Sequence, residues 1–492
     1  MTLPEIVLAT LADTHFRTDR ILIKLNRNAP ASALTDLHAR LGNQVLRTFS
    51  NMDNLQVIGL ARGTGVSNMI AAYQQSGLVR YAEPDYLMRV LVYPDDLHFW
   101  NGDQWDLINL GQYGGTPGAD IHVTNVWNIQ TSASNIIVAV IDTGIRYTHE
   151  DLAANMWVNP QENLDGYTND LYGINLVNNG RGNGDPWDDY GHGTHVAGII
   201  GAVGNNGVGI AGICWSVQLM ALKFIDTNGN GTVSDAITCI DFARSHGAKI
   251  INASWGSTAF TSQSLHDAIA SARDANIIFV AAAGNSAANN DVTPVYPADY
   301  SDLDNIISVA ATDRNDNLAA FSNYGATNVC LAAPGNPVFS CWNSSDSAYQ
   351  YYNGTSMAAA HVTGACALLE AQYPGEDYHQ IVRRILAGVD PLPGLAGKCM
   401  TGGRLNLEKA FGAATRPQLA IVATQGITQS TAPFRIHLTG DPNRTYVIQT
   451  STDLLNWTPI YTNQTAGDGT FDCYDSQAVN FGWCFYRGML VE

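Results

Sequence analysis

The sequence predicts a doubly wound, three-layer α/β domain with a mostly parallel sheet over residues 93–414. Continuous apolar runs such as Ile136–Ile141 are typical of strands buried on both faces of a parallel sheet. Helical stretches such as Asp235–His246 alternate with these runs. A composition of 46% hydrophobic and 14% charged residues suits a large folded core. Further strands are expected over 219–224, 250–254, 277–283 and 306–311, and a second helix over 264–275.

Two smaller domains are expected on either side of this one. Residues 1–92 show the pattern of a small α+β unit, and residues 417–492 that of a β-sandwich. In the first, strands are expected over 20–25, 55–61 and 79–86, and helices over 31–41 and 66–75. In the last, short strands are expected over 419–422, 434–438, 446–450 and 485–490.

The formal charge of −19 argues against nucleic acid and anionic membranes as partners. No apolar stretch approaches the roughly 20 residues needed to cross a bilayer, so no membrane span is expected. The charge is uneven, because residues 1–92 carry a net +2 and residues 93–492 a net −21. We therefore expect the first segment to dock on the acidic remainder, with chance as the competing explanation.

Three separate segments carry the residue types of a nucleophilic catalytic site. Asp142 ends a buried strand, and His192 begins an apolar helix. Ser356 begins another helix, where free N–H groups favour a developing anion. A serine hydroxyl needs a base to take its proton, and the base needs a carboxylate to fix its tautomer. The chain order Asp, His, Ser differs from that of chymotrypsin and of the α/β-hydrolases.

A fourth residue completes the candidate site. Asn285 follows a buried strand, and its amide can join the Ser356 N–H in an oxyanion hole. The sequence around Ser356 is not a G-x-S-x-G elbow, which disfavours an α/β-hydrolase. His195 lies outside any His-Glu-x-x-His pattern, so we expect it to be structural and not a zinc ligand.

These segments resemble those of the subtilisin-like serine proteases, the subtilase family. The resemblance covers about residues 95–412, and its motifs are Val138–Gly144, Gly191–Gly198, Asn353–Gly364, Ala281–Ser286, Gln104-Trp105, Ala221–Lys223, Asn252–Gly256 and Gly403–Asn406. Residues 20–88 resemble the inhibitory prosegment of the family, especially over Tyr81–Tyr86. One departure is Ala360, which stands where the family usually has a proline that shapes the helix.

The resemblance implies a serine endopeptidase that hydrolyses protein or peptide substrates through an acyl-enzyme. Asp142 would orient His192, which would act as general base and then as general acid. Ser356 would be the nucleophile and Asn285 the oxyanion donor. The substrate-binding residues would be Ser254, Trp255, Gly256, Ala283, Gly284 and Val295. In this set Ser254–Gly256 would pair with the substrate backbone, and Val295 would make the specificity pocket shallower.

The resemblance also implies a secreted, self-processing zymogen. Residues 1–92 would be an intramolecular inhibitor and folding aid, cut between about Met88 and Tyr93 by the enzyme itself. We expect an extracellular monomer, although Met1–Arg20 does not have the pattern of a signal peptide. Two alternatives stay open, namely a catalytically inactive subtilase-fold binding protein and an esterase that uses the same triad.

Calcium is the cofactor that the resemblance implies. Asp96, Asp151 and Asn206 match positions that bind calcium in many subtilases. The backbone carbonyls of Gly204, Val208 and Ile210 would complete that site, since calcium takes carboxylate, amide and carbonyl oxygens. The acidic run Asp185–Asp189 could hold a second ion, or it could be a solvated loop.

The eight cysteines include no C-x-x-C pair, so a zinc ribbon or a redox motif is not expected. Cys330 and Cys341 flank two extended segments around a Pro-Gly turn, and Cys473 and Cys484 flank a similar stretch. The sequence therefore predicts a disulfide in each of these two pairs, provided that the geometry allows it.

Overall fold

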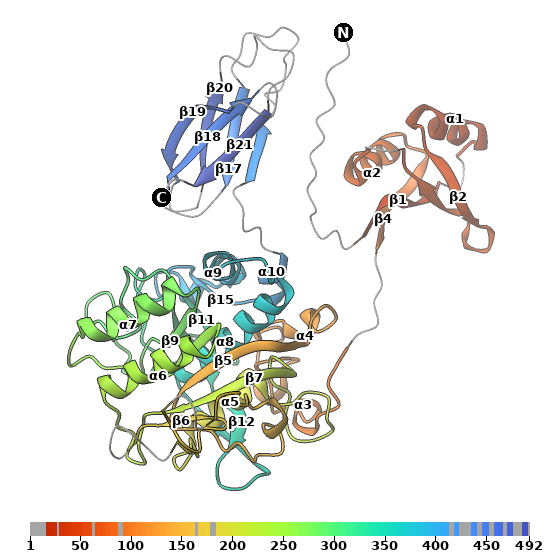
Figure 1. Ribbon diagram of the computed structural model, residues 1–492. Helices are drawn as coiled ribbons and strands as arrows, with labels where there is room; N and C mark the ends of the chain where they lie inside the picture. Colours follow the sequence, from red (N-terminus) through yellow and green to blue (C-terminus); the bar gives the residue numbers. More distant parts are fainter. Residues whose placement is uncertain are drawn as a thin grey trace. The chain divides into compact units, whose positions relative to one another are not determined.

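The computed structural model describes residues 16–26, 29–61, 64–86, 92–162, 166–177, 184–412, 418–422, 434–439, 445–451, 457–465, 470–475 and 485–490. The chain divides into two compact units, Met1–Val90 and Leu91–Glu492 (Figure 1). All of the candidate catalytic residues lie in the second unit.

The first unit is an α+β fold on a four-stranded antiparallel sheet with the order β2-β3-β1-β4. Its elements are β1 (Phe16–Leu25), α1 (Ala31–Leu41), β2 (Gln44–Phe49), β3 (Leu55–Gly59), α2 (Val66–Gln75) and β4 (Val79–Tyr86). Ile21 and Ile23 of β1 point to one face and share a core with Leu37 and Tyr73 of the helices. β2 is an addition to the expected elements, because its residues are nearly all exposed and give no alternating pattern.

A nine-stranded sheet runs through the second unit in the order β14-β15-β11-β10-β9-β8-β5-β7-β6. Its strands are β5 (Ser132–Asp142), β6 (Gly173–Asn175), β7 (Ser216–Lys223), β8 (Ile250–Ala253), β9 (Ile278–Ala282), β10 (Ile306–Asp313), β11 (Leu331–Asn336), β14 (Val389–Pro391) and β15 (Gly403–Leu405). Only β14 pairs antiparallel, so the predicted mostly parallel sheet is confirmed. The unpredicted strands β6, β14 and β15 have three residues each, which is too few to show a period.

Helices cover both faces of this sheet, which confirms the three-layer arrangement (Figure 1). The longer helices are α5 (His192–Gly201), α6 (Val233–Ser245), α7 (Gln263–Asp274), α8 (Thr355–Gln372) and α9 (Tyr378–Ala387). Short helices are α3 (Leu97–Trp100), α4 (Val123–Val126) and α10 (Leu407–Gly412). α5, α8 and α9 share a core with one face of the sheet, whereas α6 and α7 pack on the other. α8 is buried over most of its circumference, as its nearly uniform apolar sequence requires.

The carboxyl ends of three strands meet at one edge, because β5, β8 and β9 are parallel neighbours. Asp142 is the last residue of β5, Ser254 directly follows β8, and Asn285 lies three residues beyond β9. The starts of α5 and α8 lie at the same edge, since His192 bonds to Asp142 and Ser356 to Ser254. Active sites of doubly wound folds are found at this edge.

The expected disulfide between Cys330 and Cys341 is wrong, because the two thiols lie against different parts of the fold, Cys330 near the Ile306 carbonyl and Cys341 against α5. The segment between them is not a hairpin. β11 pairs with β10 and β15 in the large sheet, whereas β12 (Val338–Trp342) pairs with β13 (Ala348–Tyr352). Cys341 therefore packs toward α5, where Gly198 leaves room for its sulfur. Cys473 is also a free thiol, and its expected partner Cys484 lies outside the described residues.

The described C-terminal strands form two antiparallel three-stranded sheets, with the orders β16-β17-β20 and β19-β18-β21. Their bounds are β16 (Gln418–Val422), β17 (Phe434–Thr439), β18 (Thr445–Ser451), β19 (Thr458–Gln464), β20 (Thr470–Asp475) and β21 (Phe485–Leu490). Ile436, Leu438 and Cys473 of one sheet share a small core with Tyr446 and Ile448 of the other. This arrangement agrees with the predicted β-sandwich, to which it adds β19 and β20.

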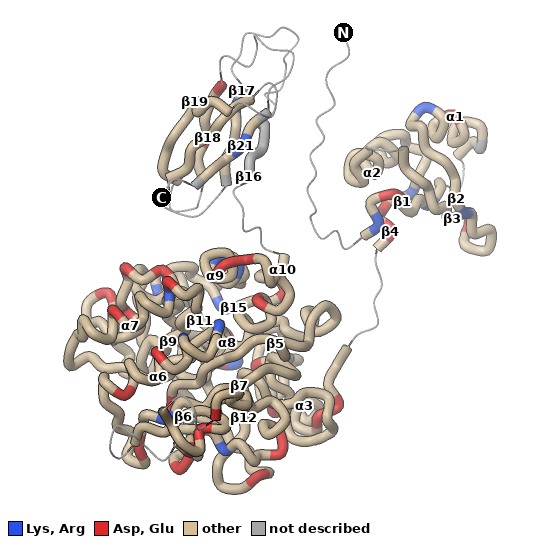
Figure 2. The backbone as a smooth tube through the Cα atoms, viewed as in Figure 1, with Lys and Arg blue, Asp and Glu red and all other residues tan. Residues whose placement is uncertain are grey.

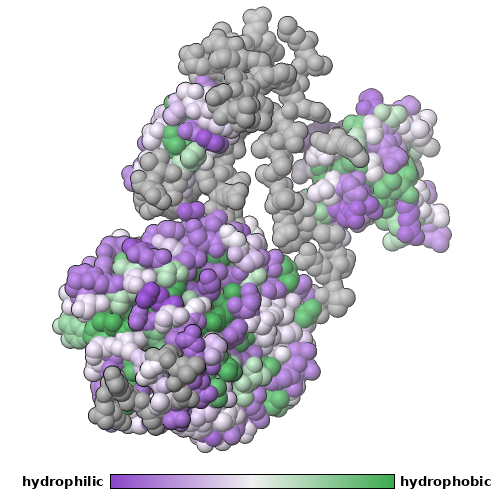
Figure 3. Space-filling model, viewed as in Figure 1, coloured by the Kyte–Doolittle hydropathy of each residue, from purple (hydrophilic) through white to green (hydrophobic). Residues whose placement is uncertain are grey.

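The second unit is rich in acidic residues. Figure 2 shows many more Asp and Glu than Lys and Arg along its backbone, in agreement with the net charge of −21 over residues 93–492. Figure 3 shows hydrophobic residues in small groups among hydrophilic ones on the visible face of this unit. None of the helices that the structure describes has the length and apolar character needed to cross a membrane.

Candidate active site

The Asp142 carboxylate and the His192 imidazole form the centre of the site. Asp142 is fully buried, and its Oδ1 accepts a hydrogen bond from His192 Nδ1 at 2.7 Å. The same oxygen accepts the backbone N–H of Thr143 at 2.7 Å, which fixes the carboxylate. Oδ2 is buried without a partner among the described residues. With its proton on Nδ1, the ring leaves Nε2 for proton transfer.

The environment of His192 favours its charged form. Burial lowers the pKa of the imidazole, but the charge and hydrogen bond of Asp142, with a smaller contribution from the Asp188 charge, raise it above its usual value. A raised pKa makes the ring a stronger base toward a hydroxyl group, as a general base requires.

Ser356 lies in the first turn of α8 with little exposure. Its hydroxyl donates to the Ser254 carbonyl at 3.2 Å, and the Ser254 hydroxyl donates to the Ser356 carbonyl at 3.1 Å. This reciprocal pair joins the start of α8 to the end of β8. Donation to His192 requires the Ser356 hydroxyl to turn away from the Ser254 carbonyl.

The Asn285 side chain is oriented through its oxygen. Oδ1 accepts the Thr355 N–H at 2.9 Å and the Thr355 hydroxyl at 3.0 Å. Because both bonds use the oxygen, the Nδ2 amide stays available to a ligand. Asn285 and Ser356 line the same pocket, so two donors can reach one ligand oxygen there.

The pocket at this edge has a volume of about 370 Å³. It is lined by Ser254, Trp255, Gly256, Ser257, Thr258, Ala282, Gly284, Asn285, Ser286, Val295, Asn323, Thr355 and Ser356. Five of the six expected substrate-binding residues are among them. The exception is Ala283, which is buried against Val329 and Leu395. Its neighbour Ala282 lines the pocket instead.

Val295 lies between the two glycine-bearing walls of the pocket. A Cβ atom on Gly256 would come within 2.9 Å of one Val295 methyl group, and a Cβ on Gly284 within 3.4 Å of the other. The segment after β8 is held by Ser257, which exchanges two backbone hydrogen bonds with Tyr296 at 2.8 and 2.9 Å. The valine therefore fills space that would otherwise be open to a side chain of a ligand.

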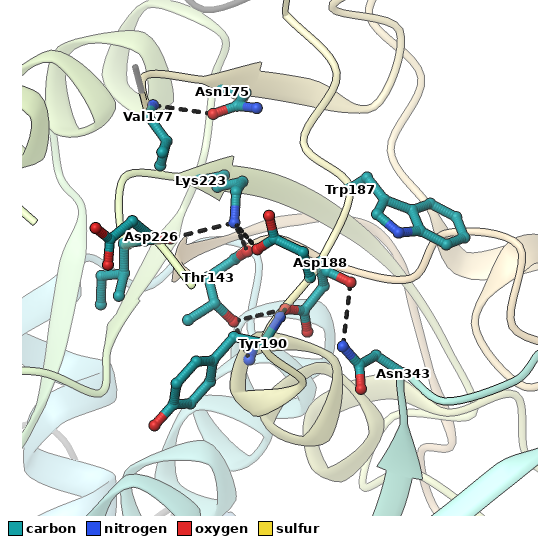
Figure 4. Close-up of polar contacts among 12 residues, drawn as sticks. Thr143, Asn175, Val177, Trp187, Asp188, Tyr190, Lys223, Asp226 and Asn343 are labelled. Carbon is teal, nitrogen blue, oxygen red and sulfur yellow. Dashed lines mark hydrogen bonds and ion pairs between the residues drawn. The ribbon is translucent and has the colours of Figure 1, made fainter. Parts of the chain in front are cut away.

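Asp188 connects the strand that carries Asp142 to the helix that carries His192 (Figure 4). Its Oδ1 accepts the Thr143 hydroxyl at 2.9 Å and the Gly191 N–H at 2.8 Å. Its Oδ2 accepts the Thr194 N–H at 2.9 Å and the Thr194 hydroxyl at 2.5 Å. The carboxylate thus satisfies donors in the first turn of α5, as a capping residue does.

Protein donors contact the carboxylates of the acidic run before His192, and both oxygens of Asp188 are used in this way. A second ion at this run stays a prediction. Asp189 pairs with the buried Lys223 ammonium at 2.7 Å. Lys223 also donates to the Thr143 carbonyl at 2.6 Å (Figure 4). Asp185 accepts the Tyr147 hydroxyl at 3.0 Å. The capping role of Asp188 was not predicted from the sequence. A signal for this role is present, because Asp188 lies four residues before the helix start and Thr194 lies in the first turn of the helix.

The residues expected to bind calcium lie close together around two fully buried carboxylates. Asp151 accepts the Asn206 amide at 2.9 Å and the Ile210 N–H at 2.9 Å, whereas Oδ1 of Asp96 has no partner in the described part of the chain. Burial, with a contribution from the Asp151 charge, raises the pKa of Asp96 to about 6. The described residues include no group of three or more His, Cys, Asp or Glu that could hold a metal, so amide and carbonyl oxygens such as those of Gly204 and Val208 would have to contribute.

His195, three residues after His192, takes no part in the pocket. Its Nε2 lies 3.0 Å from the Gln350 carbonyl, and burial lowers its pKa to about 3. A neutral imidazole bound to the backbone of β13 fits the structural role expected for it.

Two family models match the chain. The subtilase family model matches residues 133–412, more than half of the chain. The chain belongs to the subtilase family. The fervidolysin N-terminal prodomain model matches residues 4–85, within the first compact unit. The prediction of a subtilisin-like serine endopeptidase that is made as a zymogen with an N-terminal prosegment is therefore confirmed.

Curated relatives agree with this assignment. The thermophilic serine proteinase of Bacillus sp. (strain AK1) is 35% identical over 78% of this chain and 84% of that protein. Thermitase of Thermoactinomyces vulgaris is 36% identical over 59% of this chain and 93% of that protein. Subtilisin-like protease 2 of Plasmodium falciparum is 36% identical over 51% of this chain, but the chain spans only 18% of its length. The crystal structure of a cold adapted subtilisin-like serine proteinase matches with a TM-score of 0.47 and 27% identity, covering 56% of this chain and 89% of that one.

Proposed function

We propose that this subtilase hydrolyses protein and peptide substrates with Ser356 as nucleophile and His192 as general base and then general acid. Asp142 orients the imidazole, and Asn285 with the Ser356 N–H stabilises the oxyanion. The 2.7 Å bond between Asp142 and His192, at the edge where Ser356 and Asn285 line one pocket, carries this proposal.

The reaction begins when a substrate strand lies along Ser254–Gly256 and places its carbonyl carbon beside Ser356. The serine proton passes to Nε2 of His192 as Oγ attacks, and the imidazolium then protonates the leaving amine. Water hydrolyses the acyl-enzyme by the reverse sequence of proton transfers. The Asn285 amide donates to the oxyanion in both halves of the reaction.

A fluorophosphonate label tests the assignment directly. Wild-type protein is expected to carry the label on Ser356, as read by peptide mapping. Ser356→Ala should lose both the label and peptide hydrolysis while it keeps its folded circular dichroism spectrum. Ser286→Ala is the matched control, because it removes another hydroxyl group that lines the same pocket. Label on Ser356→Ala, or casein cleavage by it at the wild-type rate, would contradict the triad.

We propose three domains with separate roles. Residues 1–92 inhibit the enzyme and assist folding, residues 93–414 catalyse, and residues 417–492 form an appended sandwich. The net +2 of the first segment beside the net −21 of the remainder supports docking. The match of residues 4–85 to a prodomain supports removal of that segment. Wild type should lose about ten kilodaltons from its N-terminus, as expected for roughly 90 residues, and Ser356→Ala should stay uncut.

An uncut but fully active wild-type protein would contradict the inhibitor role. A cut Ser356→Ala protein would show that another protease does the processing. The expected bond lies between Met88 and Tyr93, and residues 87–91 of this stretch lie outside the described residues.

We propose that calcium binds at Asp96 and Asp151. Two buried carboxylates, one of them with an unpaired oxygen, are the donors that a hard cation prefers. Asn206 and the carbonyls of Gly204, Val208 and Ile210 complete the set. Bound only by the folded chain, the ion would stabilise it by linkage.

We propose export to the extracellular medium and a monomeric active form, in line with family membership. Activity in the culture medium of the source cells and the elution volume of the active protein test these two points. Activity confined to the cells, or elution as a dimer, would contradict them.

A further inference from the structure

Two cysteines that are distant in the sequence lie on adjacent stretches of backbone. Cys330 directly precedes β11, and Cys399 lies in the turn that precedes β15. The N–H of Met400 donates to the Val329 carbonyl at 2.7 Å, and the N–H of Thr401 donates to the Cys330 carbonyl at 3.1 Å. The two stretches therefore run side by side.

These hydrogen bonds limit the distance between the two Cα atoms. The Cα of Cys399 lies about 3.5 Å from the carbonyl oxygen that Met400 N–H contacts, given standard peptide dimensions. The Cα of Cys330 lies about 2.8 Å from the same oxygen, because that oxygen belongs to the preceding residue. The two Cα atoms are thus at most about 6.3 Å apart, within the range of about 4.4–6.8 Å that a disulfide spans.

The strand direction turns the two side chains toward the same region. Leu331 and Ala333 of β11 face the core formed with α8, whereas Ala332 shares a separate small cluster with Cys399. Alternation along the strand turns Cys330 the same way as Ala332. The Cys330 side chain also packs against the larger core, with its thiol 3.9 Å from the Ile306 carbonyl, so it has to turn toward Cys399 to form a bridge. Burial raises the pKa of Cys330 to about 11, and the nearby Cys399 thiol contributes.

We propose that Cys330 and Cys399 form a disulfide in an oxidising environment. The oxidant is a low-molecular-weight disulfide such as oxidised glutathione. The partly exposed Cys330, as its thiolate, attacks one sulfur and releases one reduced thiol, giving a mixed disulfide. The Cys399 thiolate then attacks the Cys330 sulfur and releases the second thiol. Both protein thiols lose their protons and together two electrons, and the oxidant becomes two thiols.

The bridge closes a loop of about 70 residues that includes Ser356 and all of α8. It also joins β11 to β15, which otherwise meet over a single register pair, Ala332 and Arg404. Closure restricts the unfolded chain and holds the last parallel strand of the sheet in place. Because the thiolates are scarce at neutral pH, the bond forms slowly and suits a structural bridge more than a rapid sensor.

Oxidation of full-length Ser356→Ala protein tests the pairing without interference from self-digestion. The folded protein is incubated with oxidised glutathione at pH 9, and the remaining thiols are alkylated after unfolding. Non-reducing peptide mapping should yield one cross-linked species, Cys330 with Cys399, at 2 Da below the sum of the two thiol peptides, as loss of two hydrogens requires. The Tm of the oxidised protein should exceed that of the reduced protein by roughly 5–10 °C.

Variants separate this bridge from other oxidation. In Cys330→Ala and in Cys399→Ala the difference in Tm between oxidised and reduced protein should vanish. Cys239→Ala is the matched control, since it removes a buried thiol of α6 and leaves the pair intact, so the difference should persist. Alkylation of both cysteines after oxidation, a bridge from Cys330 to another cysteine, or glutathione retained on Cys330 would overturn the pairing. A correct bridge with no rise in Tm would overturn its stabilising role.

Discussion

Replacing Asp188 with asparagine is expected to destabilise the start of the catalytic helix. The carboxylate accepts bonds from Thr143, Tyr190 and Gly191 on one oxygen and from Thr194 on the other. The loss of unfolding free energy is smaller when the NH₂ group of the new asparagine faces Thr194 than when it faces Thr143 and Gly191. In that orientation the Thr194 hydroxyl can turn and accept a hydrogen bond from the NH₂ group. The Thr194 N–H then lacks an acceptor in a buried place, and the remaining bonds lose their charge. We expect a loss of about 2–4 kcal/mol of unfolding free energy.

The same substitution should change the pH dependence of the reaction. The Asp188 charge is one of the influences that raise the pKa of His192, so its removal lowers that pKa. His192 must be neutral to accept the Ser356 proton, so the acidic limb of kcat/KM should move to lower pH. A displaced helix start should also lower kcat by about 10–100-fold.

Unfolding in urea, in the Ser356→Ala background, measures the first effect, and a pH–rate profile with a chromogenic peptide measures the second. Asp241→Asn is the control, since it removes the charge of an exposed aspartate whose partner Arg244 is also exposed. It should change the unfolding free energy by less than about 0.5 kcal/mol. If Asp188→Asn is equally mild and leaves the acidic limb in place, the assignment of Asp188 as a positioning residue is refuted.

Three further outcomes are expected. Asn285→Ala should lower kcat by about 10²–10³-fold with little change in Tm, as measured by active-site titration and thermal melting. A chelator should lower the Tm of wild type, but should leave that of Asp151→Asn unmoved if Asp96 and Asp151 hold the ion. Burial raises the pKa of Asp299 to about 7 in the folded protein. The folded protein therefore loses stability as pH rises from about 4 to 7, because the buried carboxyl group has to ionise. Asp299→Asn should therefore gain up to about 4 kcal/mol relative to wild type between pH 4 and 8 in urea titrations.

Local sequence signals explain why most of the fold could be predicted. The helix over Val66–Gln75 has the predicted bounds, because its apolar spacing stops just before Gly77, two residues after the last helical residue. The strand that ends at Asp142 is apolar without interruption over Ile136–Ile141, so a buried parallel strand was the natural expectation. The hairpin of β12 and β13 was missed because β13, with the sequence AYQYY, is only partly buried and has no clean alternation.

The wrong disulfide has a different origin. Cys330 and Cys341 are close in sequence and flank a Pro-Gly pair, so a local hairpin was the simplest interpretation. Parallel strands, however, pair with strands distant in sequence. β11 therefore pairs with β10 and β15, and not with the segment that follows it. The Cys330 carbonyl consequently accepts a hydrogen bond from Thr401, two residues after Cys399 and about 70 residues away in the sequence, which no local pattern could indicate.

The geometry of the triad depends on residues outside it. Asp142 and Thr143 are adjacent, so a bond from Thr143 to Asp188 fixes the end of the strand that carries the orienting carboxylate. Asp188 also holds the N–H groups that precede and follow His192. One buried carboxylate therefore determines how the strand end and the helix start face each other, and the 2.7 Å bond between Asp142 and His192 follows from that placement. The sequence identifies the two catalytic partners, but the bond from position 188 to position 143, across 45 residues, exists only in the folded chain.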